Sequence, residues 1–272
     1  MKTLKIVLSI LFGSMIHSCQ SIVQDVDLPE IEIKSVVQMR YDKALNKYDG
    51  SITKSNPIFG KPRNEFEVIE DALVTVEGGG LIDTVSYDPN SEYYTGESGI
   101  TYSVGEQYNL NVTLANGEIL TSSALYPNAP LNISMTIDST TDGFETKYNI
   151  KISWDDIPGI QEYYQVEYYS IYDFDGVKDT FGSYGQVEVG DNEKSRLTNR
   201  FETYRYSEPG SNWSYQTFVV VSGITKDQYE YSKFLYNYEP ENPFAEPVTV
   251  PSNVTGGLGM FVLKNSVITQ LK

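Results

Sequence analysis

The 272-residue chain has 37 acidic and 20 basic residues, a formal charge of −17, and a single cysteine. One cysteine excludes an internal disulfide, so a hydrophobic core must stabilise the fold. The negative charge makes nucleic acids and anionic lipid headgroups unfavourable partners, because both carry phosphate.

The first 18 residues resemble a secretory signal peptide. Two lysines precede an apolar run at residues 6–12, which is too short to span a bilayer. Residues 16–19 (Ile-His-Ser-Cys) resemble the bacterial lipobox, which predicts cleavage between Ser18 and Cys19 and a lipid on Cys19. The alternative is an ordinary signal peptide followed by a chance cysteine. Removal of residues 1–18 takes away two lysines and no acid, so the formal charge becomes −19.

Residues 19–29 are predicted to form a short tether, and residues 30–128 a first antiparallel β-sandwich. Apolar and polar residues alternate from Tyr108 to Leu114, as in a strand with one buried face, and Asn116-Gly117 then supplies a hairpin turn. Ala72, Val74 and Val76 form a second alternating strand. Turns at this spacing are typical of a sandwich of the immunoglobulin or carboxypeptidase-regulatory type.

Residues 129–272 are predicted to form a second sandwich. A strand ending at Trp154, a Pro-Gly turn and the strand Tyr164-x-Val-x-Tyr168 together resemble a fibronectin type III module, with the tryptophan in the core. A helix is expected at residues 225–238, and the apolar run that begins at Met260 predicts a final strand in the second domain. The expected fold is therefore all-β, with two antiparallel sandwiches and one helix near the C-terminus.

The C-terminal segment carries the most specific pattern. The helix is followed by Asn242-Pro243-Phe244 and then by Pro-Ser-Asn-Val-Thr-Gly-Gly-Leu-Gly-Met-Phe at residues 251–261. This tail resembles that of a Bacteroidota lipoprotein family catalogued as domain of unknown function 4249. The resemblance implies an outer-membrane accessory whose partner is a TonB-dependent transporter, and it is compatible with either face of that membrane.

The mature chain lacks the residues of several catalytic mechanisms. Its one histidine, His17, lies in the predicted signal peptide, which excludes a Ser-His-Asp triad and a histidine-ligated metal. We therefore expect no enzymatic activity and no required cofactor. A glycosidase built on two carboxylates stays open as an alternative, because the chain has many acids.

Two weaker site hypotheses concern the second sandwich. Asp173, Asp175 and Asp179 have the alternating spacing with which a calcium loop begins, although the Asp-Gly dipeptide is also a hairpin signal. Tyr163 and Tyr169 are expected to face away from the core, where tyrosines can bind a sugar or a protein. The alternative is that a loop or the C-terminal tail packs over them.

The leading functional expectation is a lipid-anchored, non-enzymatic accessory that contributes a binding surface to a transporter. Its partner surface would include Tyr163, Tyr169 and residues 242–244. A stand-alone surface module that binds glycans or acts as an adhesin is the alternative from another class.

Overall fold

The computed structural model describes residues 32–56, 66–174, 177–182, 186–189, 196–206, 213–237 and 250–271. The chain divides into two compact units, and residues 33–56 and 63–272 form the larger one, to which the following description applies. The described residues are mostly β-strand, as predicted, and include one helix. This helix is not long and apolar enough to cross a membrane.

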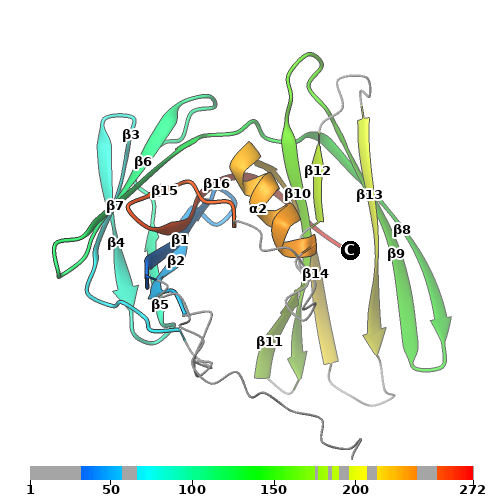
Figure 1. The fold of residues 1–272 in the computed structure, drawn as a ribbon. Coiled ribbons are helices and arrows are strands. Elements are labelled where there is room, and N and C mark those ends of the chain that lie inside the picture. Colours follow the sequence, from blue (N-terminus) through cyan, green and yellow to red (C-terminus); the bar gives the residue numbers. More distant parts are fainter. Residues whose placement is uncertain are drawn as a thin grey trace, which may run out of the picture. The chain divides into compact units, whose positions relative to one another are not determined.

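The first sandwich has two sheets that share one strand (Figure 1). One sheet contains β1 (Ser35–Asp42), β2 (Lys47–Lys54) and β5 (Tyr93–Glu97). The other contains β3 (Leu73–Gly78), β6 (Gln107–Thr113), β7 (Ile119–Leu125) and the short β15 (Val254–Thr255). The strand β4 (Leu81–Asp88) pairs with β3 over its first half and with β5 over its second.

The predicted alternation of apolar and polar residues places one face of each strand in the first core. Along β6, Tyr108, Leu110 and Val112 are buried while the residues between them are more exposed. Val74 and Val76 of β3 are also fully buried, whereas Ala72 lies before that strand begins. Gly79 and Gly80 connect β3 to β4 with positive φ values, which glycine adopts without steric cost.

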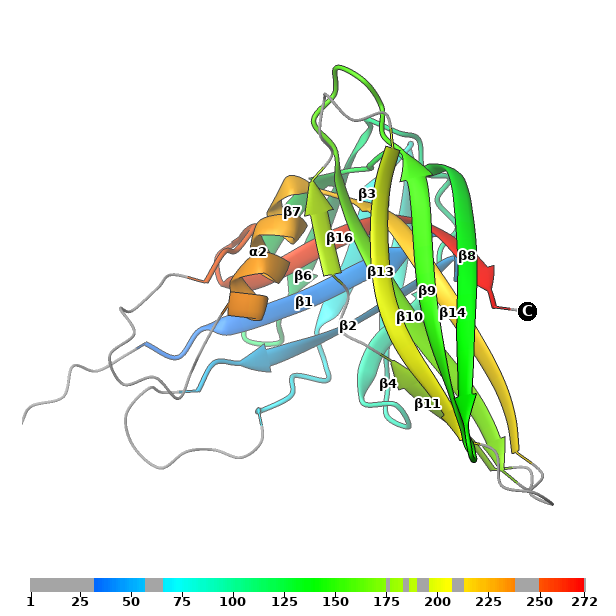
Figure 2. The same cartoon turned by 90° about the vertical axis from the view of Figure 1, so that its right-hand side faces the viewer.

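The second sandwich encloses a core that contains Trp154. One of its sheets consists of β8 (Leu131–Asp142), β9 (Glu145–Asp155) and β13 (Arg196–Tyr206). The other contains β10 (Tyr163–Phe174), β11 (Val177–Gly182), β12 (Gln186–Val189) and β14 (Trp213–Ile224). Figure 2 shows strands β8, β9 and β13 alongside β10 and β14. Trp154 is fully buried and contacts Tyr164 edge to face, with 5.6 Å between ring centroids.

The final strand, β16 (Leu258–Gln270), belongs to both sandwiches. Its first half pairs in parallel with β1, from Val36–Leu258 to Asp42–Lys264, and its second half pairs antiparallel with β14. Phe261 and Leu263 lie in the first core, whereas Leu271, just after the strand, lies in the second. The sequence placed this strand in the second domain only and predicted antiparallel pairing alone. The parallel pairing with β1 was not predicted.

Polar contacts fix the place where the two sandwiches meet. Lys264 of β16 is almost fully buried, and its Nζ atom lies 2.8 Å from a carboxylate oxygen of Glu167 on β10. The side-chain amide of Asn265 donates to the carbonyl of Pro127, 2.9 Å away. Gly223 of β14 has no room for a Cβ atom, which would lie 1.8 Å from the Asn128 carbonyl oxygen. The segment predicted as the domain boundary therefore packs directly on β14 and β16.

The helix α2 (Lys226–Asn237) contacts both sandwiches, close to its predicted range of 225–238. The Tyr229 ring lies 5.1 Å from the ring of Tyr163 on β10. The side-chain amide of Gln38 on β1 donates to the Tyr231 hydroxyl, 3.0 Å away. The Thr225 hydroxyl accepts a hydrogen bond from the amide of Gln228, which caps the first turn of the helix.

Candidate functional site

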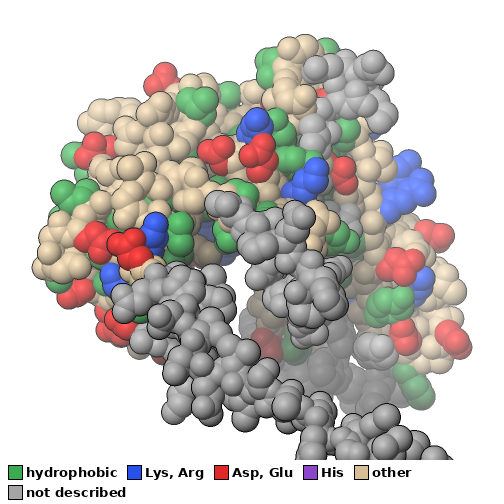
Figure 3. Space-filling view, in the orientation of Figure 1, with side chains coloured by type: hydrophobic (Ala, Val, Ile, Leu, Met, Phe, Trp, Pro, Cys, Tyr) green, Lys and Arg blue, Asp and Glu red, His purple; other side chains and the backbone are tan. Residues whose placement is uncertain are grey.

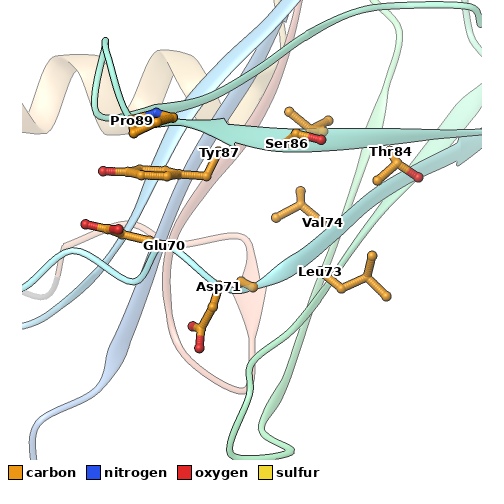
Figure 4. Close-up of a pocket in the computed structure, with 10 residues that line it drawn as sticks. Glu70, Asp71, Leu73, Val74, Thr84, Ser86, Tyr87 and Pro89 are labelled. Atoms are coloured by element: carbon orange, nitrogen blue, oxygen red, sulfur yellow. The ribbon is translucent and has the colours of Figure 1, made fainter.

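A hollow of about 560 Å³ opens in the first sandwich where β3 and β4 separate. The two strands are paired from Gly78–Leu81 to Val74–Val85. The next residue of β4, Ser86, pairs instead with Thr95 of β5. β4 therefore changes partner within a single strand, and the gap that this leaves beside β3 is the hollow (Figure 4).

Apolar, aromatic and acidic residues line this β3–β4 hollow. Val74 and Val85 are fully buried, and Leu73 is 57% exposed beside them. Figure 4 shows Tyr87 and Glu70 pointing the same way where the strands are farthest apart. The other lining residues are Asp71, Ala72, Thr84, Ser86 and Pro89. The exposed side chains that line the hollow therefore include one apolar residue, Leu73, and two acids, Glu70 and Asp71.

The buried side chain of Tyr94 fixes one lip of the hollow. Its hydroxyl donates to the carbonyl of Ile69 and accepts from the amide of Ala72, both at 2.9 Å. These two hydrogen bonds hold residues 69–72 on the core, together with the hydrogen bond that the Ile69 amide donates to the carbonyl of Ile52 on β2, 2.8 Å away. The lip carrying Glu70 and Asp71 is therefore held in place before any ligand arrives.

The electrostatic environment of the open end is negative. Loss of solvent around its hydroxyl raises the pKa of Tyr87, and the negative charges of Glu70 and Glu92 raise it further. The backbone amide of Asn90 and the hydroxyl of Ser91 donate to Asp88 and lower the pKa of that carboxyl group. Asp88 is therefore charged at neutral pH, although it does not itself line the hollow; the acids that do are Glu70 and Asp71.

The two tyrosines predicted at a partner surface both point away from the second core, and both pack against other rings. Tyr163 lies under α2, against Tyr229. Tyr169 stacks on Phe218 of the neighbouring β14, with 5.0 Å between ring centroids and 19° between ring planes. Both tyrosines are partly buried, and each has one neighbouring ring beside it.

The predicted calcium residues fall on a β-hairpin. Asp173 of β10 and Asp179 of β11 lie on adjacent antiparallel strands, with Asp173 opposite Lys178 and Asp179 opposite Tyr172. The Asp179 carboxylate accepts hydrogen bonds from the Tyr172 hydroxyl and from the amide of Thr180. In the part of the chain that the structure describes, no three metal-ligating side chains lie together. Asp175 lies outside the described residues.

Several other predicted residues also lie outside the described part of the chain. They are Ser18, Cys19, Asn242, Pro243 and Phe244. Their assigned roles in cleavage, lipid attachment and partner binding stay predictions from the sequence.

A pair of buried acids in the second sandwich was not predicted. Asp156 and Glu162 are 5% and 7% exposed, and both carboxylates lie within hydrogen-bond distance of the Tyr164 hydroxyl. These acids flank the turn that leads from β9 to β10, and the hydroxyl holds the turn on the core. Their burial keeps them from a polysaccharide chain, so they do not form a glycosidase cleft.

Comparison with known proteins gives one informative match. A family model described as "Domain of unknown function (DUF4249)" matches residues 42–268. No curated protein matches the sequence. A chain from the structure titled "Cytokine receptor complex - Crystal form 2" aligns with 68% of this chain and 89% of its own length, at 11% identity. Its TM-score of 0.22 is too low to support an argument from fold.

Proposed function

Because this chain belongs to the family described as domain of unknown function DUF4249, we propose that it is a lipid-anchored lipoprotein of the outer membrane and a non-enzymatic accessory of a TonB-dependent transporter. The observation that carries the proposal is Cys19. It is the only cysteine in the chain, and it stands where a lipobox requires the acylated residue. The resemblance of the C-terminal tail to this family supplies the transporter as partner.

The arrangement of the two sandwiches suits a protein that presents a binding surface. β16 is hydrogen-bonded to β1 on one side and to β14 on the other, so the sandwiches are joined by a continuous sheet as well as by a linker. A ligand or partner bound to one sandwich is thereby held at a defined position on the whole unit. This is the preorganisation that keeps the entropy cost of binding low.

The mechanism would be tethering. A lipid on Cys19 confines the protein to the membrane plane and raises its effective concentration beside a membrane-embedded partner. Acidic and basic side chains are interspersed on the face shown in Figure 3, without one large patch of either sign. Such a surface supports selective contacts in place of general electrostatic adhesion.

The stand-alone glycan-binding alternative depended on Tyr163 and Tyr169. Tyr163 contacts Tyr229 and Tyr169 stacks on Phe218, so each ring is partly covered. Sugar rings bind by stacking on exposed aromatic faces. Because these two rings are partly covered, the glycan-binding alternative has less support than the accessory role.

The test is co-purification from outer membranes. A tagged full-length chain is expressed in its own host and extracted in mild detergent, and captured proteins are identified by mass spectrometry. We expect a TonB-dependent transporter with the wild-type chain. The matched control is Cys19→Ala, which should lose palmitate labelling and should leave the membrane or stay unprocessed. A processed Cys19→Ala variant that stays fully membrane-bound would refute lipid anchoring, and capture without any transporter would refute the partner.

A further inference from the structure

The strand β8 has one open edge. It is the outermost strand of its three-stranded sheet (Figure 2). It pairs with β9 on one side, in a regular register from Ser134 to Asp142, and no described residue pairs with it on the other. Edge strands in proteins are commonly protected by lysine, by proline or by being short. β8 has 12 residues and contains neither lysine nor proline, so its edge is free to pair with another strand.

The hairpin that ends β8 shows which of its backbone groups point to the open edge. A two-residue turn connects Asp142 to Glu145, which makes these two a hydrogen-bonded pair. Backbone groups alternate in direction along a strand, so every second residue before Asp142 also points to β9. The odd-numbered residues from 135 to 141 therefore direct their N–H and C=O groups to the open edge.

The side chains beside this edge form an apolar row that is only partly covered. Ile133 and Met135 are half-buried against the second core, and Ile137 is 37% exposed. Alternation along the strand places all three on the face of β8 that points to the core. A strand added at the open edge would continue this apolar layer and remove more of its surface from water.

The sequence of the row identifies the added strand. Residues 133–137 read Ile-Ser-Met-Thr-Ile, which is almost the same in both directions. In a two-fold antiparallel pair of β8 strands centred on Met135, each Met135 lies opposite the other and each Ile133 lies opposite an Ile137. The hydroxyl residues at 134 and 136 face each other in the same way. A symmetric dimer requires such self-complementarity, and an unrelated partner does not.

Charge also favours this register. Each copy has a formal charge of −17, so two copies repel unless their acids stay away from the contact. Residues 133–137 include no charged side chain, and the nearest acid, Asp138, would lie opposite Asn132 of the second copy. A register centred on Asp138 would place two carboxylates opposite each other, which is unfavourable.

We infer that two copies of this chain associate through their β8 strands, which pair antiparallel about Met135 and join the two three-stranded sheets into one. This pairing goes beyond the proposed function and depends on neither the lipid anchor nor the transporter. An anchor would strengthen it, because confinement to a membrane raises the effective concentration of one copy beside another.

Sedimentation equilibrium tests the dimer, with the full-length chain carrying Cys19→Ala in a density-matched detergent. We expect a monomer–dimer equilibrium that tightens as salt is added, because salt screens the repulsion between two acidic copies. Met135→Lys should weaken association about tenfold or more, because it places two ammonium groups opposite each other at the two-fold axis. Ser139→Lys makes the same change of charge on the same strand, outside residues 133–137, and should not weaken association. A chain that stays monomeric at about 0.1 mM, or equal effects of the two lysine variants, would overturn the inference.

Spin labels test the register and leave residues 133–137 unchanged. The Cys19→Ala chain has no other cysteine, so one label can be attached at Thr140→Cys or at Asp142→Cys. In a pair centred on Met135, the two labels lie about 34 Å apart at position 140 and about 48 Å apart at position 142, at 3.4 Å per residue. We expect pulsed electron paramagnetic resonance to find both distances. No distance between copies, or a longer one at position 140 than at 142, would refute the pairing. Transporter capture is measured separately, so failure of the dimer and failure of the proposed function are distinguishable.

Discussion

Replacement of Gly259 by alanine tests the shared strand most directly. Gly259 has a φ of +120° and pairs with Val37 of β1 near the start of β16. A Cβ atom at this position would lie 1.8 Å from the Val37 carbonyl oxygen and 2.9 Å from its amide nitrogen. Because both contacts are with backbone atoms, β1 and β16 must move apart locally to accommodate the methyl group.

The expected cost has two parts. A backbone conformation that only glycine adopts readily costs about 1–3 kcal/mol for alanine. Separation of the strands weakens one or two backbone hydrogen bonds, each contributing about 1 kcal/mol. Together these give a loss of about 2–5 kcal/mol in the free energy of unfolding. The matched control is Gly80→Ala in the β3–β4 turn, where φ is +78° and no atom lies within 4 Å of the added Cβ. It should cost only about 1–2 kcal/mol.

The assay is urea unfolding of the full-length chain, followed by far-ultraviolet circular dichroism and by tryptophan fluorescence. Trp154 lies in the second core, whereas Gly259 pairs with a strand of the first sandwich. Because β16 serves both cores, we expect Gly259→Ala to shift both signals together. Equal midpoints for Gly259→Ala and Gly80→Ala would show that the close approach of Val37 is not enforced. A shift in circular dichroism alone would show that the two sandwiches unfold independently.

Three further predictions concern the two cores and the place where they meet. Trp154→Ala should cost about 3–5 kcal/mol, because the ring is fully buried, and an unchanged melting temperature would mean that it is not a core residue. Lys264→Met should cost about 2 kcal/mol by leaving the Glu167 carboxylate without its cation, a value reduced because that carboxylate is about a quarter exposed. The double variant with Glu167→Gln should recover most of this loss in the same unfolding assay, and no recovery would contradict the ion pair. Burial raises the pKa of Tyr41 to about 12, and also raises those of Tyr48, Tyr102, Tyr126 and Tyr164 above their ordinary value of 10. Because these pKa values are higher in the folded state than in the unfolded state, ionisation of the tyrosines opposes folding. Their contribution to the free energy of unfolding should be fully present below pH 10 and should be lost as the pH rises through the raised values. Native-state titration of these tyrosines at pH 10, seen by ultraviolet absorbance, would contradict their burial.

Local patterns in the sequence predicted much of the fold. The alternation at Tyr108, Leu110 and Val112 marks a strand with one buried face, and Trp154 ends a strand as expected. The apolar run from Met260 to Leu263 correctly indicated a strand, whose residues at these positions are buried on both faces. Its partners were not predicted, because both are distant in the sequence. β1 lies more than two hundred positions earlier, and β14 lies about forty to fifty positions earlier. Periodicity reports burial of a face, and it does not report which strand lies alongside.

The candidate site was harder to predict than the fold. Val74, Val85 and Tyr87 have ordinary strand sequences, and the hollow arises only because β4 changes partner between Val85 and Ser86. Tyr163 and Tyr169 drew attention as outward-facing tyrosines, yet α2 and Phe218 cover them. Glu70 and Asp71 were the available signal in the sequence. They lie just before the strand predicted at Ala72, Val74 and Val76, in a segment for which no site was predicted.

The parallel pairing of β1 with β16 also determines how the protein would respond to mechanical force. β1 is the first described strand, and it lies between β2 and β16 along almost its whole length. If Cys19 carries the proposed lipid, a pull on the chain ahead of Ser35 enters the described fold at the start of β1. The hydrogen bonds to both neighbours run across the axis of β1, so a pull along this axis loads them in shear and they must fail together instead of opening one after another. A protein anchored at its N-terminus would therefore resist extraction or stretching most strongly at the strand where the force enters.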